Sequence, residues 1–242
     1  PPPLGSLAAE ASVTVGTDGE LRNSGILNVP IGDTLAVRLV GFRNRTDGFI
    51  RNKFLNQDYN GEKNYGFRGK LLFEPSDNVS LLVSADYAKD TSVCCFSTAR
   101  TLGANANLAN YFDIYGVVPG PDNLDVVAGK PFGTYPGTTL RVYKRASAEL
   151  NVDLGGVELT SITAYRKNHY ILDFDGDQSP LDRFDYNGGD YDYRQFSQEL
   201  RLASPAGHTI EWLAGLFYFR STNDVFYQAG GRLLGPAPLP LV

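Results

Sequence analysis

Several residue types are scarce in this chain of 242 residues, and each scarcity narrows the possible functions. The chain has no Met, two Cys, two His and one Trp. The two histidines, His169 and His208, are too few for a metal site that needs three imidazoles. The cysteines, Cys94 and Cys95, are adjacent and lack the spacing of a zinc site or a Cys-x-x-Cys redox motif. We therefore interpret them as a loop pair and expect no metal and no cofactor.

Long apolar runs and excess positive charge are also missing. The longest apolar run, Trp212 to Phe219, has eight residues, whereas a membrane-spanning helix needs about 20. Any membrane role must therefore use β-strands or partners. The net charge of −5 disfavours nucleic acid as a partner, because phosphate binding needs a basic surface. No nucleophile elbow, phosphate-binding loop or dinucleotide-binding glycine motif occurs, so we expect no enzyme activity.

What the chain has in abundance is alternation of apolar and polar residues. In NVSLLVSADY (78–87), Val79, Leu81 and Val83 lie on one face and Ser80 and Ser84 on the other. The pattern predicts nine strands, several longer than the five or six residues usual in soluble sheets. ELTSITAYRK (158–167) alternates poorly, which allows a bulge there. The nine strands are expected near residues 8–16, 20–29, 34–46, 64–74, 78–89, 141–153, 157–170, 192–203 and 208–222.

The connections between these strands are of two kinds. Tight turns rich in Pro, Gly, Asp and Ser are expected at PIGD (30–33), PSDN (75–78), DLGG (153–156) and SPAG (204–207). Long connections cover roughly 47–63, 90–140 and 171–191, and they alternate with the tight turns. The short TDGE link near residue 18 is the exception. In an up-and-down meander, this alternation places the tight turns at one end and the long connections at the other.

This asymmetry is typical of outer-membrane β-barrels, which also carry aromatic girdles at both membrane interfaces. We assign the following residues to such girdles, the first beside a tight turn and the others toward the long connections: Trp212, and then Tyr87, Tyr143, Tyr165, Tyr170, Tyr218 and Phe219. The predicted fold class is all-β, an antiparallel up-and-down meander that forms part of a large transmembrane β-barrel with about nine strands present. A soluble β-sandwich or an extracellular binding module remains the alternative, because alternation alone fits both.

Two groups of charged residues are candidates for a site. Asp173, Asp175 and Asp177 have the 1, 3, 5 spacing of a calcium loop, but Gln178 and Phe184 stand where an EF-hand has Gly and Glu. They are a weak cation-site candidate within an acidic loop. Arginines recur at strand positions with polar neighbours. One interpretation is a ladder of charges that contacts a plug domain or an anionic substrate. The other is pairing with cross-strand carboxylates such as Glu149 or Glu199. These arginines are Arg38, Arg68, Arg166 and Arg201.

Four stretches, in order, resemble barrel hairpins of TonB-dependent outer-membrane receptors. They are NVPIGDTLAVRLVGFRNRTDGFIRN (28–52), YGFRGKLLFEPSDNVSLLVSADY (65–87), VELTSITAYR (157–166) and SQELRLASPAGHTIEWLAGLFYF (197–219). The resemblance implies a large plugged barrel in the outer membrane of a Gram-negative bacterium. It also implies TonB-dependent import of a scarce ligand, such as an iron-siderophore, haem, cobalamin or a glycan.

The resemblance also predicts the domain organisation. Residues 1–242 are expected to be a partial receptor barrel domain, the N-terminal half of the barrel, with strands between about 8 and 222 and proline-rich ends. The chain begins PPPLG, and we expect it to be a mature or excised piece that lacks the plug domain. Its expected partners are membrane lipid, TonB through the missing plug, and a small-molecule ligand such as a metal chelate. Alone, this piece is not expected to transport.

Overall fold

The computed structural model describes residues 2–53, 55–93, 96, 98, 125–126, 138–176, 184, 186–207, 209–231 and 235–241, and these form an all-β fold. Ten strands form one antiparallel sheet in the order β1-β2-β3-β6-β7-β9-β10-β11-β12-β13, and three short strands form a second sheet in the order β5-β4-β8. Among the described residues there is no helix long and apolar enough to span a membrane. The strands are β1 (Ala8–Val15), β2 (Leu21–Ile31), β3 (Leu35–Thr46), β4 (Ile50–Asn52), β5 (Gln57–Tyr59), β6 (Glu62–Ser76), β7 (Val79–Asp90), β8 (Asp125–Val126), β9 (Thr138–Asp153), β10 (Glu158–Phe174), β11 (Tyr186–Ala203), β12 (Leu213–Gly231) and β13 (Gly235–Leu241).

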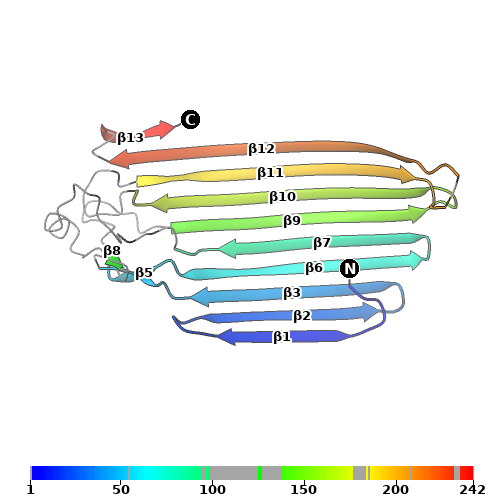
Figure 1. The fold of residues 1–242 in the computed structure, drawn as a ribbon, viewed down its shortest axis with the longest axis horizontal. Helices are drawn as coiled ribbons and strands as arrows, with labels where there is room; N and C mark the ends of the chain where they lie inside the picture. Colours follow the sequence, from blue (N-terminus) through cyan, green and yellow to red (C-terminus); the bar gives the residue numbers. More distant parts are fainter. Residues whose placement is uncertain are drawn as a thin grey trace.

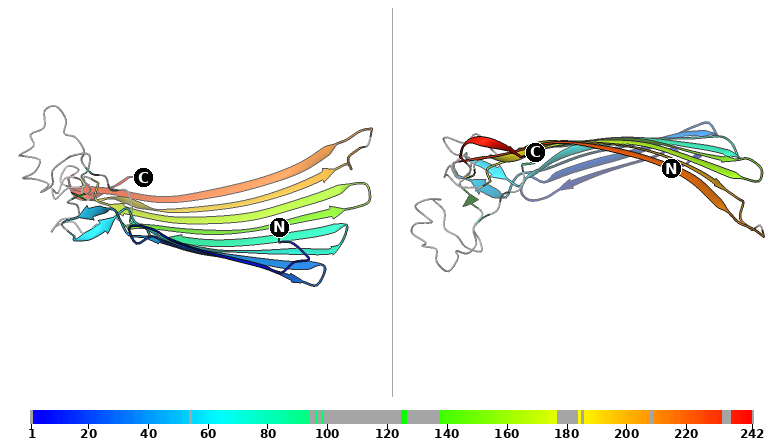
Figure 2. Two further views of the ribbon diagram at one scale, coloured as in Figure 1. Left: turned by 60° about the horizontal axis from the view of Figure 1, so that its bottom comes forward. Right: turned by 90° about the horizontal axis from the view of Figure 1, so that it is seen from above.

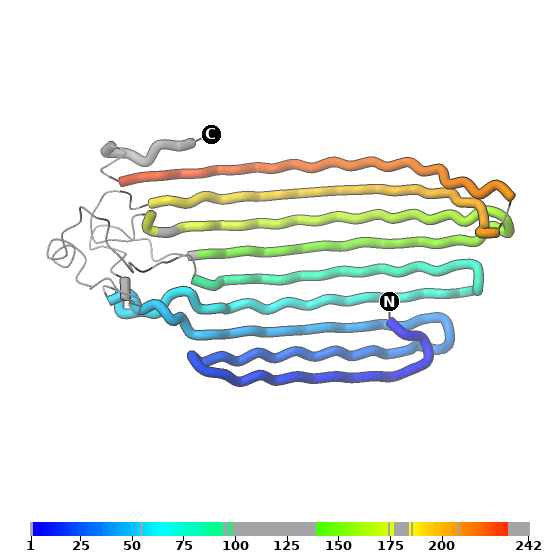
Figure 3. Tube along the Cα trace, in the orientation of Figure 1, coloured from blue at the N-terminus to red at the C-terminus, as the bar shows by residue number. Residues whose placement is uncertain are grey.

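The large sheet is a simple meander: its strands lie side by side in the order in which they occur along the chain (Figure 1). The chain runs back and forth along the long axis, as Figure 3 traces from β1 to β12. The sheet is twisted and curved (Figure 2), as the right-handed twist of individual strands requires. Its outer strands, β1 and β13, do not pair with each other in the described residues.

The predicted separation of tight turns from long connections is confirmed. The turns β2–β3, β6–β7, β9–β10 and β11–β12 lie at one end, which we call the tight-turn end (right in Figure 1). The connections β3–β6, β7–β9 and β10–β11 lie at the other, the long-connection end. The link between β1 and β2 is also at this end but is short, because Asp18 and Gly19 take up left-handed conformations in a tight hairpin turn.

All nine predicted strands are present, with corrected bounds at the C-terminal side. β11 begins at Tyr186 and not near 192, so the acidic connection spans 175–185 and not 171–191. β12 begins at Leu213 and not near 208, so Trp212 precedes the strand. The bulge that the sequence allows in 158–167 is absent, since β10 pairs in continuous register with both neighbours. A tenth strand, β13, was not predicted, because its sequence GPAPLPL contains three prolines.

The connection between β3 and β6 shares a small core with the connection between β7 and β9 at the long-connection end. Tyr59 is fully buried and packs against Phe96 with ring centroids 4.0 Å apart and an interplanar angle of 31°, and Ile50 completes the cluster. Asn60 fixes Phe96 through two hydrogen bonds: its Nδ2 donates to the Phe96 carbonyl (2.7 Å), and its Oδ1 accepts from the Phe96 amide (3.1 Å). Burial raises the pKa of the Tyr59 phenol. The described parts of these two connections therefore pack against each other.

The two faces of the large sheet differ in chemistry. Directly opposed residues lie on the same face of an antiparallel sheet. The register therefore places Val37, Leu71, Val83 and Ala148 in one row across β3, β6, β7 and β9, on what we call the apolar face. The next row, Arg38, Lys70, Ser84 and Ser147, lies on the opposite side, the polar face.

On the central strands the apolar face is the more exposed one, whereas β12 is exposed on both faces over most of its length. Leu39 and Phe67 on this face are 51% and 60% exposed, whereas Ala36 and Leu72 on the polar face are 0% and 6% exposed. The N-terminal segment lies on the polar side, where the buried Asn28 donates hydrogen bonds from Nδ2 to the Pro3 and Ser6 carbonyls. A sheet in water normally buries its apolar face, so this arrangement is the reverse of a soluble sheet.

Candidate functional site

A group of tyrosines and arginines lies on the polar face in its long-connection half. Tyr170 on β10 lies directly opposite Arg141 on β9 and Tyr191 on β11. Tyr143 and Tyr193 both lie opposite Asn168, which places them on this same face. We call the following set the tyrosine–arginine cluster: Arg141, Tyr143, Arg145, Tyr170, Tyr191 and Tyr193.

The rings of this cluster are mutually stacked and flanked by guanidinium groups. The Tyr170 and Tyr191 centroids are 5.4 Å apart with an interplanar angle of 28°, and those of Tyr191 and Tyr193 are 6.4 Å apart at 4°. The Cζ atom of Arg141 lies 4.8 Å from the Tyr170 ring centroid, which is cation–π geometry. Arg145 lies 5.9 Å from the ring of Tyr143. Stacking of this kind holds the rings and the positive charges in a fixed arrangement.

A cavity of about 320 Å³ adjoins the cluster between β3 and β9. Its lining includes Tyr143 and Arg145. It also includes Arg68 and Asp86, which form an ion pair with Arg68 Nη2 and Asp86 Oδ1 2.7 Å apart. Arg145 lies opposite both Asp86 on β7 and Arg166 on β10. Positive charge exceeds negative charge here, because Asp86 is already paired with Arg68 and neither Arg145 nor Arg166 forms an ion pair with a described carboxylate.

Chemically, the cluster suits a ligand that is both anionic and aromatic. Guanidinium groups bind oxyanions through charge-assisted hydrogen bonds, and flat ring faces accept other rings by stacking. In the part of the chain that the structure describes, no three His, Cys, Asp or Glu side chains are grouped to hold a bare metal ion.

The cation-loop candidate is only partly visible. Asp173 lies within β10, paired with Gly188, and not in a loop as expected. Its Oδ1 is buried without a hydrogen-bond partner among the described residues. Asp175 is buried at 2% exposure just beyond the strand. Asp177 lies outside the described residues, so the three-aspartate site stays a prediction.

The four predicted arginines all lie on the polar face, and their surroundings differ. Arg68 pairs across strands with Asp86, as the structural interpretation predicts. Arg201 pairs with Glu199 at 2.5 Å, but this partner is two residues away on the same strand and not across strands. Arg38 lies opposite Lys70, and Arg166 lies opposite Arg145, so each faces a like charge. Carboxylate pairing therefore accounts for two of the four.

The aromatic girdle is corrected by the register. Tyr87, Tyr165 and Tyr218 lie on the apolar face, as a girdle requires. Tyr143, Tyr170 and Phe219 lie on the polar face, because each is an odd number of residues from the apolar-face positions of its strand. Strand parity was the signal in the sequence that separates these two sets.

The cysteines and one histidine of the sequence analysis, Cys94, Cys95 and His208, lie outside the described residues. His169 lies on the apolar face with its Nδ1 3.3 Å from Asp190.

Comparison with known proteins finds relatives of this fold among solved structures. No family model and no curated protein matches the sequence. Several solved structures match, and two of them match over nearly the whole chain. The ferric yersiniabactin uptake receptor FyuA from Yersinia pestis has 15% identity and a TM-score of 0.72, covering 95% of this chain and 33% of the receptor. The ferric-catecholate import receptor Fiu from E. coli K12 has 14% identity and a TM-score of 0.69, covering 98% and 34%.

These matches confirm the predicted fold class. The chain spans about a third of the length of each receptor. Both are described as import or uptake receptors and not as enzymes. The chain therefore has the fold of a segment of these β-barrel uptake receptors, with a long antiparallel meander as its main element.

Proposed function

We propose that this chain forms part of the barrel wall of a TonB-dependent outer-membrane receptor that imports an anionic metal chelate. The apolar face contacts lipid, and the polar face lines the interior. The tight-turn end lies at the periplasmic side and the long-connection end at the cell surface. TonB acts through a plug domain and supplies the energy for import.

The observation that carries this proposal is the reversed exposure of the sheet. On the central strands β3 and β6, Leu39 and Phe67 of the apolar face are 51% and 60% exposed, whereas Ala36 and Leu72 of the polar face are 0% and 6% exposed. An exposed apolar surface of this extent is unstable in water and suits lipid. A β-sandwich would cover it with a second sheet, and no described strand lies on it. This favours the barrel over the soluble alternative.

The ligand class follows from the tyrosine–arginine cluster. In the proposed orientation, the cluster lies inside the barrel near the cell surface, where an incoming ligand arrives first. Ferric complexes of catechols and phenols combine negative charge with aromatic rings, which matches guanidinium groups beside stacked tyrosines. The two matched receptors are described as taking up ferric yersiniabactin and ferric catecholates, and we extend this type of ligand to the present chain.

Uptake by cells tests the proposal. The complete reading frame that encodes this chain is deleted, and ⁵⁵Fe uptake from a catecholate and from a hydroxamate complex is compared with that of the parent strain. We expect loss of catecholate uptake, retention of hydroxamate uptake, and restoration by the intact gene only when TonB is present. Equal uptake of both complexes in the deleted and parent strains would reject this ligand class.

A further inference from the structure

Two aromatic side chains flank two small residues in one row of the polar face, beside the tyrosine–arginine cluster. Phe42 on β3, Gly66 on β6, Ala88 on β7 and Tyr143 on β9 lie in directly opposed positions. Phe42, Ala88 and Tyr143 all line the cavity of about 320 Å³. The cavity therefore has an aromatic wall on each side and a small residue between them.

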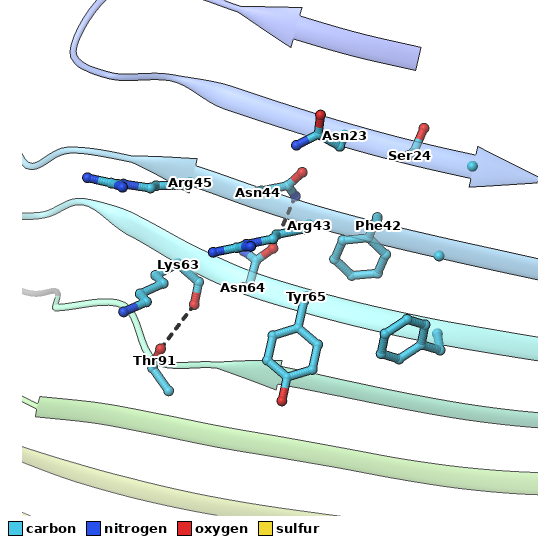
Figure 4. Close-up of a pocket in the computed structure, with 13 residues that line it drawn as sticks. Asn23, Ser24, Phe42, Arg43, Asn44, Arg45, Lys63, Asn64, Tyr65 and Thr91 are labelled. Atoms are coloured by element: carbon cyan, nitrogen blue, oxygen red, sulfur yellow. Dashed lines mark hydrogen bonds between the residues drawn. The ribbon is translucent and has the colours of Figure 1, made fainter. Parts of the chain in front are cut away.

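The absence of a side chain at Gly66 brings one of these walls inward. A Cβ at Gly66 would lie 2.7 Å from Cε1 and 2.9 Å from Cζ of Phe42, so the phenyl ring occupies the space that a side chain would need. Figure 4 shows this ring extending from β3 toward β6, next to the hydrogen bond that Asn44 Nδ2 donates to Asn64 Oδ1 (3.0 Å). Because the ring covers Gly66, the unfilled space of the row lies above Ala88. We call this space the ring slot.

The ring slot has room for one aromatic ring. Two strand spacings, roughly 10 Å, separate β6, which Phe42 covers, from β9, which carries Tyr143. Two aromatic contacts with centroids about 4.5–5 Å apart span this distance. The cavity volume of about 320 Å³ is near the lower limit of small-molecule pockets, which are about 300–1,000 Å³. The slot therefore suits one ring with its substituents rather than a whole chelate.

A hydrogen-bond acceptor and a donor lie side by side in the same cavity. Asp86 and Arg145 are directly opposite each other on β7 and β9, and both line the cavity. Asp86 Oδ1 accepts from Arg68 Nη2 (2.7 Å), and Asp86 Oδ2 has no hydrogen-bond partner among the described residues. Opposed side chains have Cβ atoms about 4.5–5.5 Å apart, so one edge of a ligand can reach both groups.

We propose that the ring slot binds one aromatic ring of the ligand through a hydroxyl group next to an oxyanion. This binding mode rests on the proposed function and names the part of the ligand that the wall reads. The ring stacks between Phe42 and Tyr143. Its oxyanion accepts hydrogen bonds from Arg145, and its hydroxyl donates to Asp86. The two substituents stand on neighbouring ring carbons, as in catechol and 2-hydroxybenzoyl groups, because Asp86 and Arg145 are neighbours across one strand pair.

Binding of two isomers tests the ring slot without iron and without TonB. Radiolabelled 2-hydroxybenzoate and 4-hydroxybenzoate are dialysed to equilibrium against the detergent-solubilised protein from its complete reading frame, and uptake by empty micelles is subtracted. The isomers have the same atoms and charge, but only the first can reach Asp86 and Arg145 together. We expect it to bind at least about tenfold more tightly, as one further hydrogen bond to a charged group provides. Equal binding of the isomers would overturn the inference.

Matched variants locate the ring. Ala88→Leu fills the slot and should weaken binding of 2-hydroxybenzoate at least about tenfold, because the hydrogen bonds to charged groups are lost. Ser84→Leu adds a leucine to the same strand and face outside the cavity lining, and it should bind like the wild type. Circular dichroism confirms that both variants keep their β-structure. Equal effects of the two variants, or full binding by Ala88→Leu, would place the ring elsewhere and reject the slot.

A third variant tests the acceptor and does not depend on the folding of Ala88→Leu. Asp86→Ala removes the acceptor and keeps Arg145, so both isomers should bind with similar affinity. A tenfold preference for 2-hydroxybenzoate that survives in this variant would contradict the assigned role of Asp86 and overturn the inference.

Uptake by cells separates the two proposals. If gene deletion abolishes ⁵⁵Fe uptake from the catecholate complex while the dialysis shows no preference between the isomers, only the ring slot fails. If deletion leaves catecholate uptake unchanged, the proposed ligand class fails, and the assignment of the bound ring to an imported ligand fails with it.

Discussion

Arg145 on β9 and Arg166 on β10 lie directly opposite each other on the polar face. Like charges at directly opposed positions destabilise a sheet by a few tenths of a kcal/mol or more. Neither guanidinium is neutralised by a carboxylate of the described residues. Because this pair does not stabilise the fold, we interpret it as charge held ready for an anion, beside the rings of the tyrosine–arginine cluster.

The first prediction uses one variant to separate the effect of Arg145 on stability from its effect on ligand binding. Arg145→Gln removes the repulsion, so the free energy of unfolding should stay the same or rise by about 0.2–1 kcal/mol. Ferric catecholate affinity should fall roughly tenfold or more, since a hydrogen bond to a charged group contributes about 1.5–3 kcal/mol. Urea unfolding in lipid and ligand titration measure the two quantities. Loss of stability without loss of affinity would mean that Arg145 is structural.

Arg201→Gln provides the control for that variant. Arg201 lies on the same face but toward the tight turns, and its charge is already satisfied by Glu199. The pair is solvent-accessible, with side chains 47% and 29% exposed, so its loss should change the free energy of unfolding little. Ligand affinity should be unchanged.

The second prediction concerns the two sets of tyrosines. Tyr191→Ala removes the middle ring of the Tyr170–Tyr191–Tyr193 stack and should weaken ligand binding by about 0.5–1.5 kcal/mol. Tyr165→Ala, on the apolar face, should leave ligand binding intact and weaken membrane anchoring. Ligand titration and thermal unfolding in vesicles distinguish them. Similar ligand losses in both variants would contradict the assignment of faces.

The third prediction tests the apolar face energetically. Val83 lies midway along the apolar side of β7, and Ser84 is its neighbour on the polar face. Val83→Arg should destabilise the membrane-inserted protein by about 2–4 kcal/mol, as expected for a cation on the lipid face near the midplane. Ser84→Arg is the matched control and should have a small effect. The free energy of unfolding in vesicles is the measurement, and equal costs would argue against a lipid-facing Val83.

The fourth prediction concerns the small core that the β3–β6 and β7–β9 connections share. Tyr59 is fully buried against Phe96 and Ile50, and truncation of a buried aromatic side chain costs about 3–5 kcal/mol. Tyr59→Ala should therefore open these two connections to protease while the large sheet stays folded. Limited proteolysis with mass mapping of the cleavage sites is the test. Cleavage within the strands of the large sheet would mean that the small core is not independent.

The sequence was most informative where a strand has one apolar side. The alternation of Val79, Leu81 and Val83 is enough to predict β7 and the face it presents. The start of β11 could not be predicted in this way, because YNGGDY looks like a turn. The structure explains it by close approach: a Cβ on Gly188 would lie 2.2 Å from the Leu172 carbonyl oxygen, and one on Gly189 would lie 2.4 Å from that of Phe226.

The candidate site was harder to predict than the strands. Tyr170 and Tyr191 become neighbours only once the register of β10 against β11 is fixed, and the sequence alone does not give that register. The polar-face position of Tyr143 was available from parity, since Ala146 is three residues away. The β13 strand was hidden by its prolines, which an edge strand tolerates because only one side is paired.

The most direct test of the account is a spin-label scan along β7 in phosphatidylcholine vesicles. Single cysteines are placed at each position from 79 to 87, with Cys94 and Cys95 replaced by serine, and accessibility to oxygen is compared with that to a water-soluble nickel chelate. We predict a period of two, in which positions 79, 81, 83 and 85 are reached by oxygen from lipid and the alternate positions by nickel from water. Water access at all positions, or the opposite phase, would contradict the claim that the apolar face of this sheet lies in the membrane.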